Sequence, residues 1–173
     1  MLVTVQEFLD RPESEGYIEE LIGGEVISMP RAGYPHEITK SNLVRVLTVW
    51  SLPNPAVRIF IEAAYQLDDH YCLIPDISLD TRRVAPGSTG IFQSAPELAI
   101  EVVSSETAAR LEKKIRLYLT HGGKSVWAVF PEERMVRIHH ASHQLTTFLG
   151  DEPLADPILA GFSVPTSAIF EGV

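Results

Sequence analysis

The sequence predicts an α/β (α+β) fold in which a mixed β-sheet is flanked by helices, with an N-terminal hairpin. Strand-like runs lie on both sides of a helical segment at 104–121, as in folds that pack helices on a sheet. The run 97–103 is apolar except for one acid, which is typical of a strand in the middle of a sheet. Gly23 and Gly24 separate two short β-like runs and indicate a tight hairpin.

Turn residues and periodicity place the elements of the first half. We expect, in chain order, a short helix at 4–10, a hairpin of 17–22 with 25–29, a helix from 36 to about 50, and strands at 56–67 and 73–79. Thr4 and Glu7 have the spacing of a capping box at the start of the first helix. Pro53 and Pro55 end the longer helix, whose apolar residues recur on one face.

The second half continues the alternation of strands and helices. We expect a loop at 81–96, a strand at 97–103, a helix to about 121, a hairpin of 125–130 with 135–139, a strand at 144–149, and a short helix or turn at 167–170. Ser104 or Ser105 is the predicted N-cap of the helix, and Gly122 with Gly123 ends it. The apolar stripe of this helix consists of Ala108, Leu111, Ile115 and Tyr118.

Composition sets limits on the class of protein. The 173 residues, 45% of them hydrophobic, predict a single domain over 1–173 with a real core. We expect a cytoplasmic protein, because no apolar run could span a bilayer and the first residues lack the features of a secretion signal. The net charge of −9 argues against binding nucleic acid through a general basic surface, although acids that hold a metal contribute to that charge.

Two carboxylates interrupt otherwise apolar strands. Asp76 lies in the run 73–79 and Glu101 in the run 97–103. A charge in an apolar strand is costly to bury unless it is neutralised, and two such strands can neutralise their charges by holding a divalent cation between them. Each acid has a simpler interpretation, Asp76 as a turn residue and Glu101 as a member of a buried salt bridge with Arg116 or Lys114. Taken together, the two acids favour the interpretation as a metal site.

A lysine on the following helix completes the set. Lys113 and Lys114 are adjacent and point about 100° apart on a helix. Lys114 lies on the flank of the apolar stripe and can lean back over Glu101, whereas Lys113 points toward solvent. Two acids and a lysine from neighbouring elements are the minimum set for metal-assisted hydrolysis of a phosphodiester, in which the lysine orients or deprotonates the attacking water. Glu20 in the hairpin and His36 at a helix start are additional candidates.

Ordered motifs along the whole chain resemble the Uma-type family of putative restriction endonucleases, a domain of unknown function in the PD-(D/E)XK nuclease superfamily. The matching segments are Tyr17–Glu25, His36, Ile74–Ser78, Ala95–Ser104, Glu112–Lys114 with Tyr118, Val126–Val129, and Gly161–Phe162 with Val164–Pro165. Two features depart from the family pattern. Ser104-Ser105 lacks the proline of the family's Ser-Pro-Ser, and Phe130 replaces an acid before Pro131.

The resemblance implies a restriction-endonuclease-like sheet with Asp76 and Glu101 as ligands of Mg²⁺, or of Mn²⁺. A main-chain carbonyl near Val102 would complete the metal shell. The superfamily's lysine, usually two residues after the acid, would be replaced by Lys114 from the helix. DNA is the implied substrate.

A homodimer is also expected, because a mixed sheet has exposed edges and a nuclease that cuts both strands benefits from two sites.

Two alternatives stay open on the sequence alone. The acidic composition and the shortened segment after Glu101 are compatible with a non-catalytic binding or regulatory module that keeps the nuclease fold. A structural dimer with a buried ion pair is a further possibility.

Overall fold

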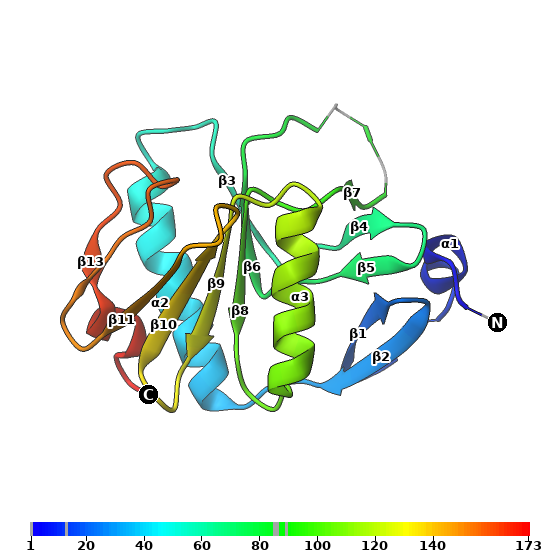
Figure 1. Cartoon of the computed structure of the whole chain (residues 1–173), viewed down its shortest axis with the longest axis horizontal. Helices are drawn as coiled ribbons and strands as arrows, with labels where there is room; N and C mark the ends of the chain where they lie inside the picture. Colours follow the sequence, from blue (N-terminus) through cyan, green and yellow to red (C-terminus); the bar gives the residue numbers. More distant parts are fainter. Residues whose placement is uncertain (1, 13, 85–86, 89) are drawn as a thin grey trace.

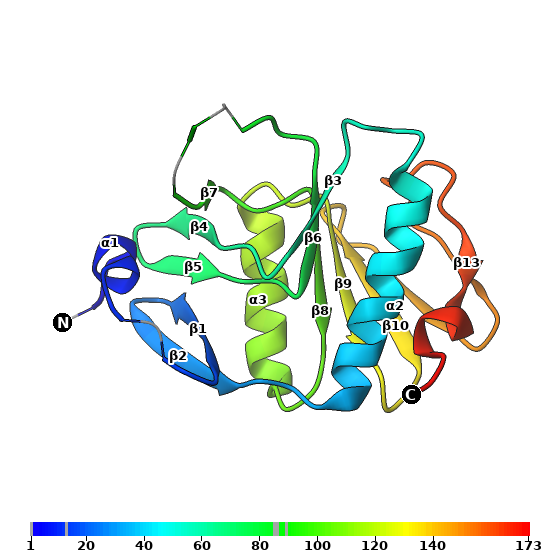
Figure 2. The ribbon, with the colours of Figure 1, turned by 180° about the vertical axis from the view of Figure 1, so that it is seen from behind.

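Two helices lie on opposite faces of a six-stranded sheet, and a second sheet extends from one side of it (Figures 1 and 2). This computed structural model describes residues 2–12, 14–84, 87–88 and 90–173. The N-terminus lies beside the second sheet, and the C-terminus lies at the far end of the molecule (Figure 1). The prediction of a mixed sheet flanked by helices, with an N-terminal hairpin, is confirmed.

The six-stranded sheet forms the centre of the molecule. Its strands are β3 (Arg58–Ile61), β6 (Ile77–Asp80), β8 (Leu98–Val102), β9 (Ser125–Phe130), β10 (Met135–His140) and β11 (Leu145–Leu149). They lie in the order β11-β10-β9-β8-β6-β3. β8 and β9 are parallel, whereas the other neighbours are antiparallel. The sheet is mixed because the parallel pair is joined by a helix while the remaining pairs include hairpins.

Alternation along β8 gives the sheet two apolar faces. On one face, Ile100 belongs to the same core as Leu43 and Leu47 of α2 (Tyr34–Ser51). On the other face, Ala99 packs with Leu111 and Ile115 of α3 (Ala108–Thr120). Successive side chains of a strand point to opposite sides, so one buried strand serves both cores.

The second sheet carries the N-terminal hairpin. Its strands are β1 (Tyr17–Ile22), β2 (Glu25–Pro30), β4 (Tyr65–Asp68), β5 (Tyr71–Leu73) and β7 (Phe92–Gln93), in the order β2-β1-β5-β4-β7. The predicted capping box of α1 (Val5–Leu9) is present. The chain ends with β12 (Pro153–Leu154), β13 (Val164–Pro165) and the 3₁₀ helix η1 (Thr166–Phe170).

The prediction of one continuous strand at 56–67 and another at 73–79 is wrong. Each is broken in the middle and passes from one sheet to the other: β3 is followed by β4, and β5 by β6. Glu62 has a positive φ of 51° at the first break, and Pro75 lies at the second. The backbone N–H of Glu62 donates to the carbonyl of Asp76 at 3.2 Å, so the two breaks lie side by side. This junction brings two acidic residues to one place.

The start of α3 also differs from the prediction. Its N-cap is Thr107, whose hydroxyl accepts from the N–H of Arg110, and not Ser104 or Ser105. Ala108 is exposed, while the other three residues of the predicted stripe are buried. The predicted loop 81–96 contains β7, and its residues 85, 86 and 89 lie outside the described part of the chain. None of the helices described is long and apolar enough to cross a membrane.

Candidate active site

Asp76 and Glu101 lie on the same face of the central sheet. Ile77 is paired with Ile100, and one further step of this antiparallel register places Asp76 opposite Glu101. Side chains directly opposite each other in an antiparallel pair point to the same side. Oδ2 of Asp76 accepts a hydrogen bond from the N–H of Val102 at 2.7 Å. Both acids line one cavity of about 290 Å³.

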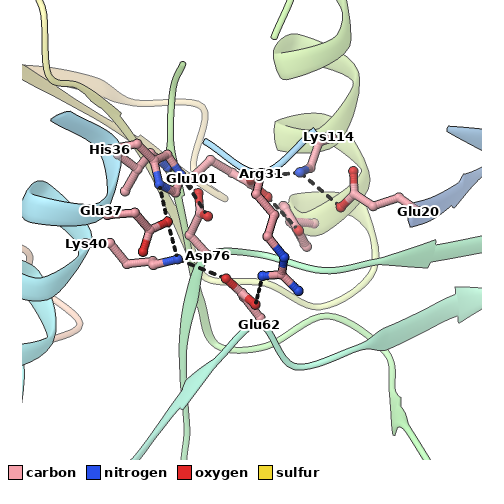
Figure 3. A network of polar contacts seen from close by, with 11 residues as sticks. Glu20, Arg31, His36, Glu37, Lys40, Glu62, Asp76, Glu101 and Lys114 are labelled. Atoms are coloured by element: carbon pink, nitrogen blue, oxygen red, sulfur yellow. Dashed lines mark hydrogen bonds and ion pairs between the residues drawn. The ribbon is translucent and has the colours of Figure 1, made fainter. Parts of the chain in front are cut away.

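Glu101 is buried but not unpaired. Its Oε2 lies 2.7 Å from Nζ of Lys114, and its Oε1 accepts from the hydroxyl of Tyr118 at 2.8 Å. Lys114 also contacts Oε1 of Glu20 at 3.0 Å, and the same oxygen accepts from the N–H of Ile74 at 2.8 Å. Figure 3 shows Lys114 reaching from α3 to the carboxylate of Glu20. One ammonium group therefore connects strands of both sheets.

The cluster contains two carboxyl groups but one amino group. Glu20, Glu101 and Lys114 are each no more than 5% exposed. Burial raises the pKa of Glu101 well above its ordinary value, although Lys114 opposes the shift. For Lys114, burial alone would lower the pKa, but the attraction of Glu101 and Glu20 outweighs it and raises the pKa. Lys114 is thus held as an ammonium ion, because two carboxylates share its charge.

A second network joins Asp76 to α2. His36 Nε2 lies 3.0 Å from Oδ1 of Asp76, and its Nδ1 lies 3.1 Å from Oε1 of Glu37 (Figure 3). Nζ of Lys40 is 2.9 Å from both Glu37 and Glu62. Burial acts to lower the pKa of His36, but its contacts with the two carboxylates outweigh burial and the net shift is upward.

Arg31 extends this network to the rim of the cavity. Its guanidinium lies 3.9 Å from Oε2 of Glu62, and its side chain is 65% exposed. Glu62 is therefore placed between the buried ammonium of Lys40 and the solvent-exposed guanidinium of Arg31. The cavity thus has an acidic interior beside β8 and cationic groups on the side of α2 and the hairpin.

The matched family model covers residues 5–167 and is described as a putative restriction endonuclease. The chain belongs to this Uma2 family. A crystal structure of a putative nuclease of the DUF820 family from Anabaena variabilis ATCC 29413 has a TM-score of 0.86 to the chain, at 28% sequence identity over 97% of each chain. A search of curated proteins found no match. The resemblance inferred from the sequence motifs is confirmed, and the chain has a nuclease-like fold.

All five residues predicted for the site lie in these two networks of the Uma2 fold. Asp76, Glu101 and Lys114 line the cavity together with His36, while Glu20 lies behind Lys114. The sequence alone did not indicate the ion pairs of α2 and the hairpin, which involve Arg31, Glu37, Lys40 and Glu62. Tyr118 was predicted as a member of the apolar stripe and of a family motif, but not as a hydrogen-bond donor to the site. Its hydroxyl at the end of a buried ring was the one signal that it needed a polar partner.

The donor set of this Uma2 member fits a magnesium ion that is held only in part by protein. Within the described ranges, no group of three or more His, Cys, Asp or Glu side chains is arranged to hold a metal. Mg²⁺ commonly binds one or two carboxylates and completes its shell with waters and substrate phosphates. Asp76 and Glu101 supply two carboxylates on one cavity, and each of their oxygens, although engaged by a protein donor, keeps a second lone pair for a cation.

Cys72 has no place in this chemistry. It is buried, and burial raises the pKa of its thiol to about 12. A thiol with so high a pKa is protonated at neutral pH, and the thiolate is the nucleophilic form. Cys72 also does not line the site cavity, so it is not a candidate nucleophile there.

Proposed function

We propose that this member of the Uma2 family is a metal-dependent endonuclease that hydrolyses phosphodiester bonds of DNA. The observation that carries the proposal is that Asp76, Glu101 and Lys114 line a single cavity although they come from three separate segments. The register of β8 places Glu101 at the cavity, the break before β6 places Asp76 there, and the buried face of α3 places Lys114 there. Structural ion pairs alone do not require a cavity beside them.

In this proposal, Asp76 and Glu101 hold Mg²⁺, or Mn²⁺ in its place. The ion, when bound, would polarise the phosphate and lower the pKa of a bound water. Asp76 Oδ2 is fixed by the N–H of Val102, so its second oxygen is oriented toward the cavity side where His36 lies. His36 orients this carboxylate, as outer partners commonly do for metal ligands.

Lys114 acts as a fixed positive charge beside the reacting phosphate. Its ammonium is already paired with Glu20 and Glu101, so it keeps its proton and stabilises negative charge that develops on phosphate oxygens. The sequence left open whether this lysine orients or deprotonates the attacking water. The contacts favour orientation and charge stabilisation.

A second hollow, lined by Arg11 and Arg31 as well as by Glu15, Glu19 and Glu62, adjoins the site cavity. This hollow of about 730 Å³ shares Arg31 and Glu62 with the site cavity, which leaves room for nucleotides on one side of the cleaved bond. Arg31 is exposed between the two and is available for a phosphate contact. Such local contacts are compatible with the overall charge of −9. Only the phosphate charges of the DNA strand that lies next to the site need to be neutralised by the protein.

A cleavage assay tests the proposed function. We expect the wild-type protein to cut supercoiled plasmid, linear duplex or single-stranded DNA in the presence of Mg²⁺ or Mn²⁺ but not with a chelator. Asp76→Asn and Glu101→Gln should remove cleavage, whereas Asp69→Asn, a change at an exposed turn aspartate, should leave it intact. Equal cleavage by wild type and Asp76→Asn would show that a contaminating nuclease is responsible and would contradict the proposal.

A non-catalytic binding or regulatory module that keeps the nuclease fold is the second candidate. It is favoured by the closed geometry of Glu101, whose two oxygens are both engaged by protein donors. Calorimetry with Mn²⁺ separates the candidates. Binding that is lost in Glu101→Gln supports the nuclease, and no heat of binding supports the module.

We also propose that the chain forms a homodimer through a sheet edge. β3 and β11 are the edge strands of the central sheet, and β11 carries exposed Leu145 and Leu149. Sedimentation velocity tests this assembly. A single species of monomer mass at all concentrations would contradict it.

A further inference from the structure

One acidic side chain on the wall of the site cavity has no role in the networks described above. Glu106 lies in the segment between β8 and α3 and lines the same cavity as Asp76, Glu101 and Lys114. Its Oε1 is buried and has no hydrogen-bond partner among the described residues. A buried carboxylate oxygen without a partner is costly to a protein, so its presence beside a site calls for a functional explanation.

The other charged side chains that line the cavity are already paired with one another. Lys114 donates to two carboxylates, and Glu101 accepts from Lys114 and Tyr118. Asp76 accepts from the N–H of Val102 and contacts His36. Among the described residues, Glu20 Oε2 and Glu106 Oε1 are buried carboxylate oxygens without a hydrogen-bond partner, and of these two residues only Glu106 lines the cavity.

The charges around Glu106 favour a group that accepts a proton. Burial raises its pKa above the ordinary value, and Glu20 and Asp76 raise it further, while Lys114 and Arg110 oppose the shift. Glu101 also faces Glu106 from β8. A general base is most effective when its pKa approaches the pH at which it works. The remaining charged groups that line the cavity are Arg31, His36, Glu37, Lys40 and Glu62.

We propose that Glu106 is the general base that accepts the proton of the attacking water. The water oxygen forms a bond to phosphorus as its proton passes to the carboxylate of Glu106. The bond from phosphorus to one sugar oxygen breaks, and that oxygen keeps the electron pair and takes a proton from solvent. Glu106 then returns its proton to bulk water. This inference rests on the proposed nuclease function and assigns Lys114 to charge stabilisation alone.

Substitution by glutamine tests the role, because Glu106→Gln keeps the shape and removes the base. We expect the single-turnover rate of cleavage to fall by about 100-fold or more, with little change in the DNA concentration at half-maximal rate. The wild-type rate should rise with pH and then level off, and the variant should lose that dependence. Glu106→Asp should retain part of the rate. Glu112→Gln is the matched control, since Glu112 is exposed on α3 and does not line this cavity.

Two measurements without turnover complete the test. In a ¹³C NMR titration of labelled glutamate carboxyl groups, the signal lost in Glu106→Gln should titrate at higher pH than those of exposed glutamates. Calorimetric binding of Mn²⁺ should survive in Glu106→Gln, because Glu106 is not proposed as a ligand.

The outcomes separate the two proposals. Wild-type cleavage that Glu106→Gln matches in rate and pH profile would overturn this inference and leave the nuclease function standing. Titration of Glu106 together with the exposed glutamates would also overturn it, since the side chain would then lie in bulk water. Absence of cleavage by the wild type under all conditions would overturn both.

Discussion

At the scale of single residues, the site depends on burying one ammonium group between two carboxylates. Lys114 and Glu20 are at most 3% exposed as side chains, and Glu101 is 7% exposed. In such a buried environment, ion pairing offsets the free-energy cost of removing these charges from water only while every partner is present. Removing the cation would leave two buried carboxylates without a counter-charge. The stability of the fold and the composition of the site are therefore coupled at this lysine.

Lys114→Met should destabilise the protein by about 3–5 kcal/mol, the usual cost of breaking a buried ion pair from one side. The neighbouring Lys113→Met is the matched control. Lys113 is only half-buried and its ammonium lies 5.7 Å from the ring centre of Tyr71, so its loss should cost about 1 kcal/mol or less. Urea unfolding followed by circular dichroism gives both values. Equal effects of the two substitutions would show that the buried pair contributes no more than a surface charge.

The contact between His36 and Asp76 should make stability depend on pH. The pKa of His36 is raised from 6.5 in the folded protein, so the protonated ring binds more tightly there than in the unfolded chain. Its contribution is fully present below 6.5 and is lost as the pH rises through the raised folded-state pKa. The free energy lost in His36→Gln should therefore be larger at about pH 5 than at about pH 9.

Urea unfolding at both pH values measures this difference. His143→Asn serves as the control, because His143 is exposed in a turn with a positive φ of 64°, a conformation that asparagine tolerates. A His36→Gln effect that grows with pH would contradict the assignment of a protonated ring. If His143→Asn showed the same pH dependence as His36→Gln, the effect would come from the unfolded chain and not from the contact with Asp76.

The sequence was sufficient to select five residues that the structure brings together, but not the partners of these residues. Asp76 and Glu101 were recognisable because a charge in an apolar strand violates the strand pattern, and Lys114 because of its position on a helix face. The partners of Lys40 and Glu62 were not recognisable. These two residues are 22 positions apart, and their contact depends on how the breaks between sheets orient the chain.

At the scale of elements, local signals predicted what local interactions determine. The hairpin around Gly23 and Gly24 and the hairpin of β9 and β10 formed as expected, because each joins neighbouring segments. The passage of the chain from one sheet to another at Glu62 and at Pro75 was not predicted. Both runs have continuous β character, and periodicity within a strand carries no information on which sheet it joins.

The N-cap of α3 can be tested by substitution. Thr107→Ala should destabilise the protein by about 1 kcal/mol, because the N–H of Arg110 would lose the hydroxyl that accepts its hydrogen bond. Ser105→Ala is the control at a position where the sequence also allowed a cap, and it should change stability by less than about 0.5 kcal/mol. Thermal or urea unfolding measures both. A larger loss at Ser105 would place the helix start earlier than the structure has it.

At the scale of the whole molecule, acidic side chains from several elements gather at one cavity. The chain has a net charge of −9, and several of its acids line the site cavity at the junction of the two sheets. Segments from both sheets, α2 and α3 contribute to this cavity, so its shape exists only in the folded chain. A ligand that binds there stabilises the fold as a whole.

Divalent cations should therefore raise the thermal unfolding midpoint. An ion at 100 times its dissociation constant adds about 2.7 kcal/mol if it binds only the folded state. For a domain of this size, that free energy corresponds to an increase of about 5–10 °C. Differential scanning calorimetry with and without Mn²⁺ measures the shift. Asp76→Asn should reduce it strongly, and Asp69→Asn should preserve it, because Asp69 is an exposed residue away from the cavity. A shift of the same size in Asp76→Asn would mean that the cation binds elsewhere, and the proposed metal site would have to be abandoned.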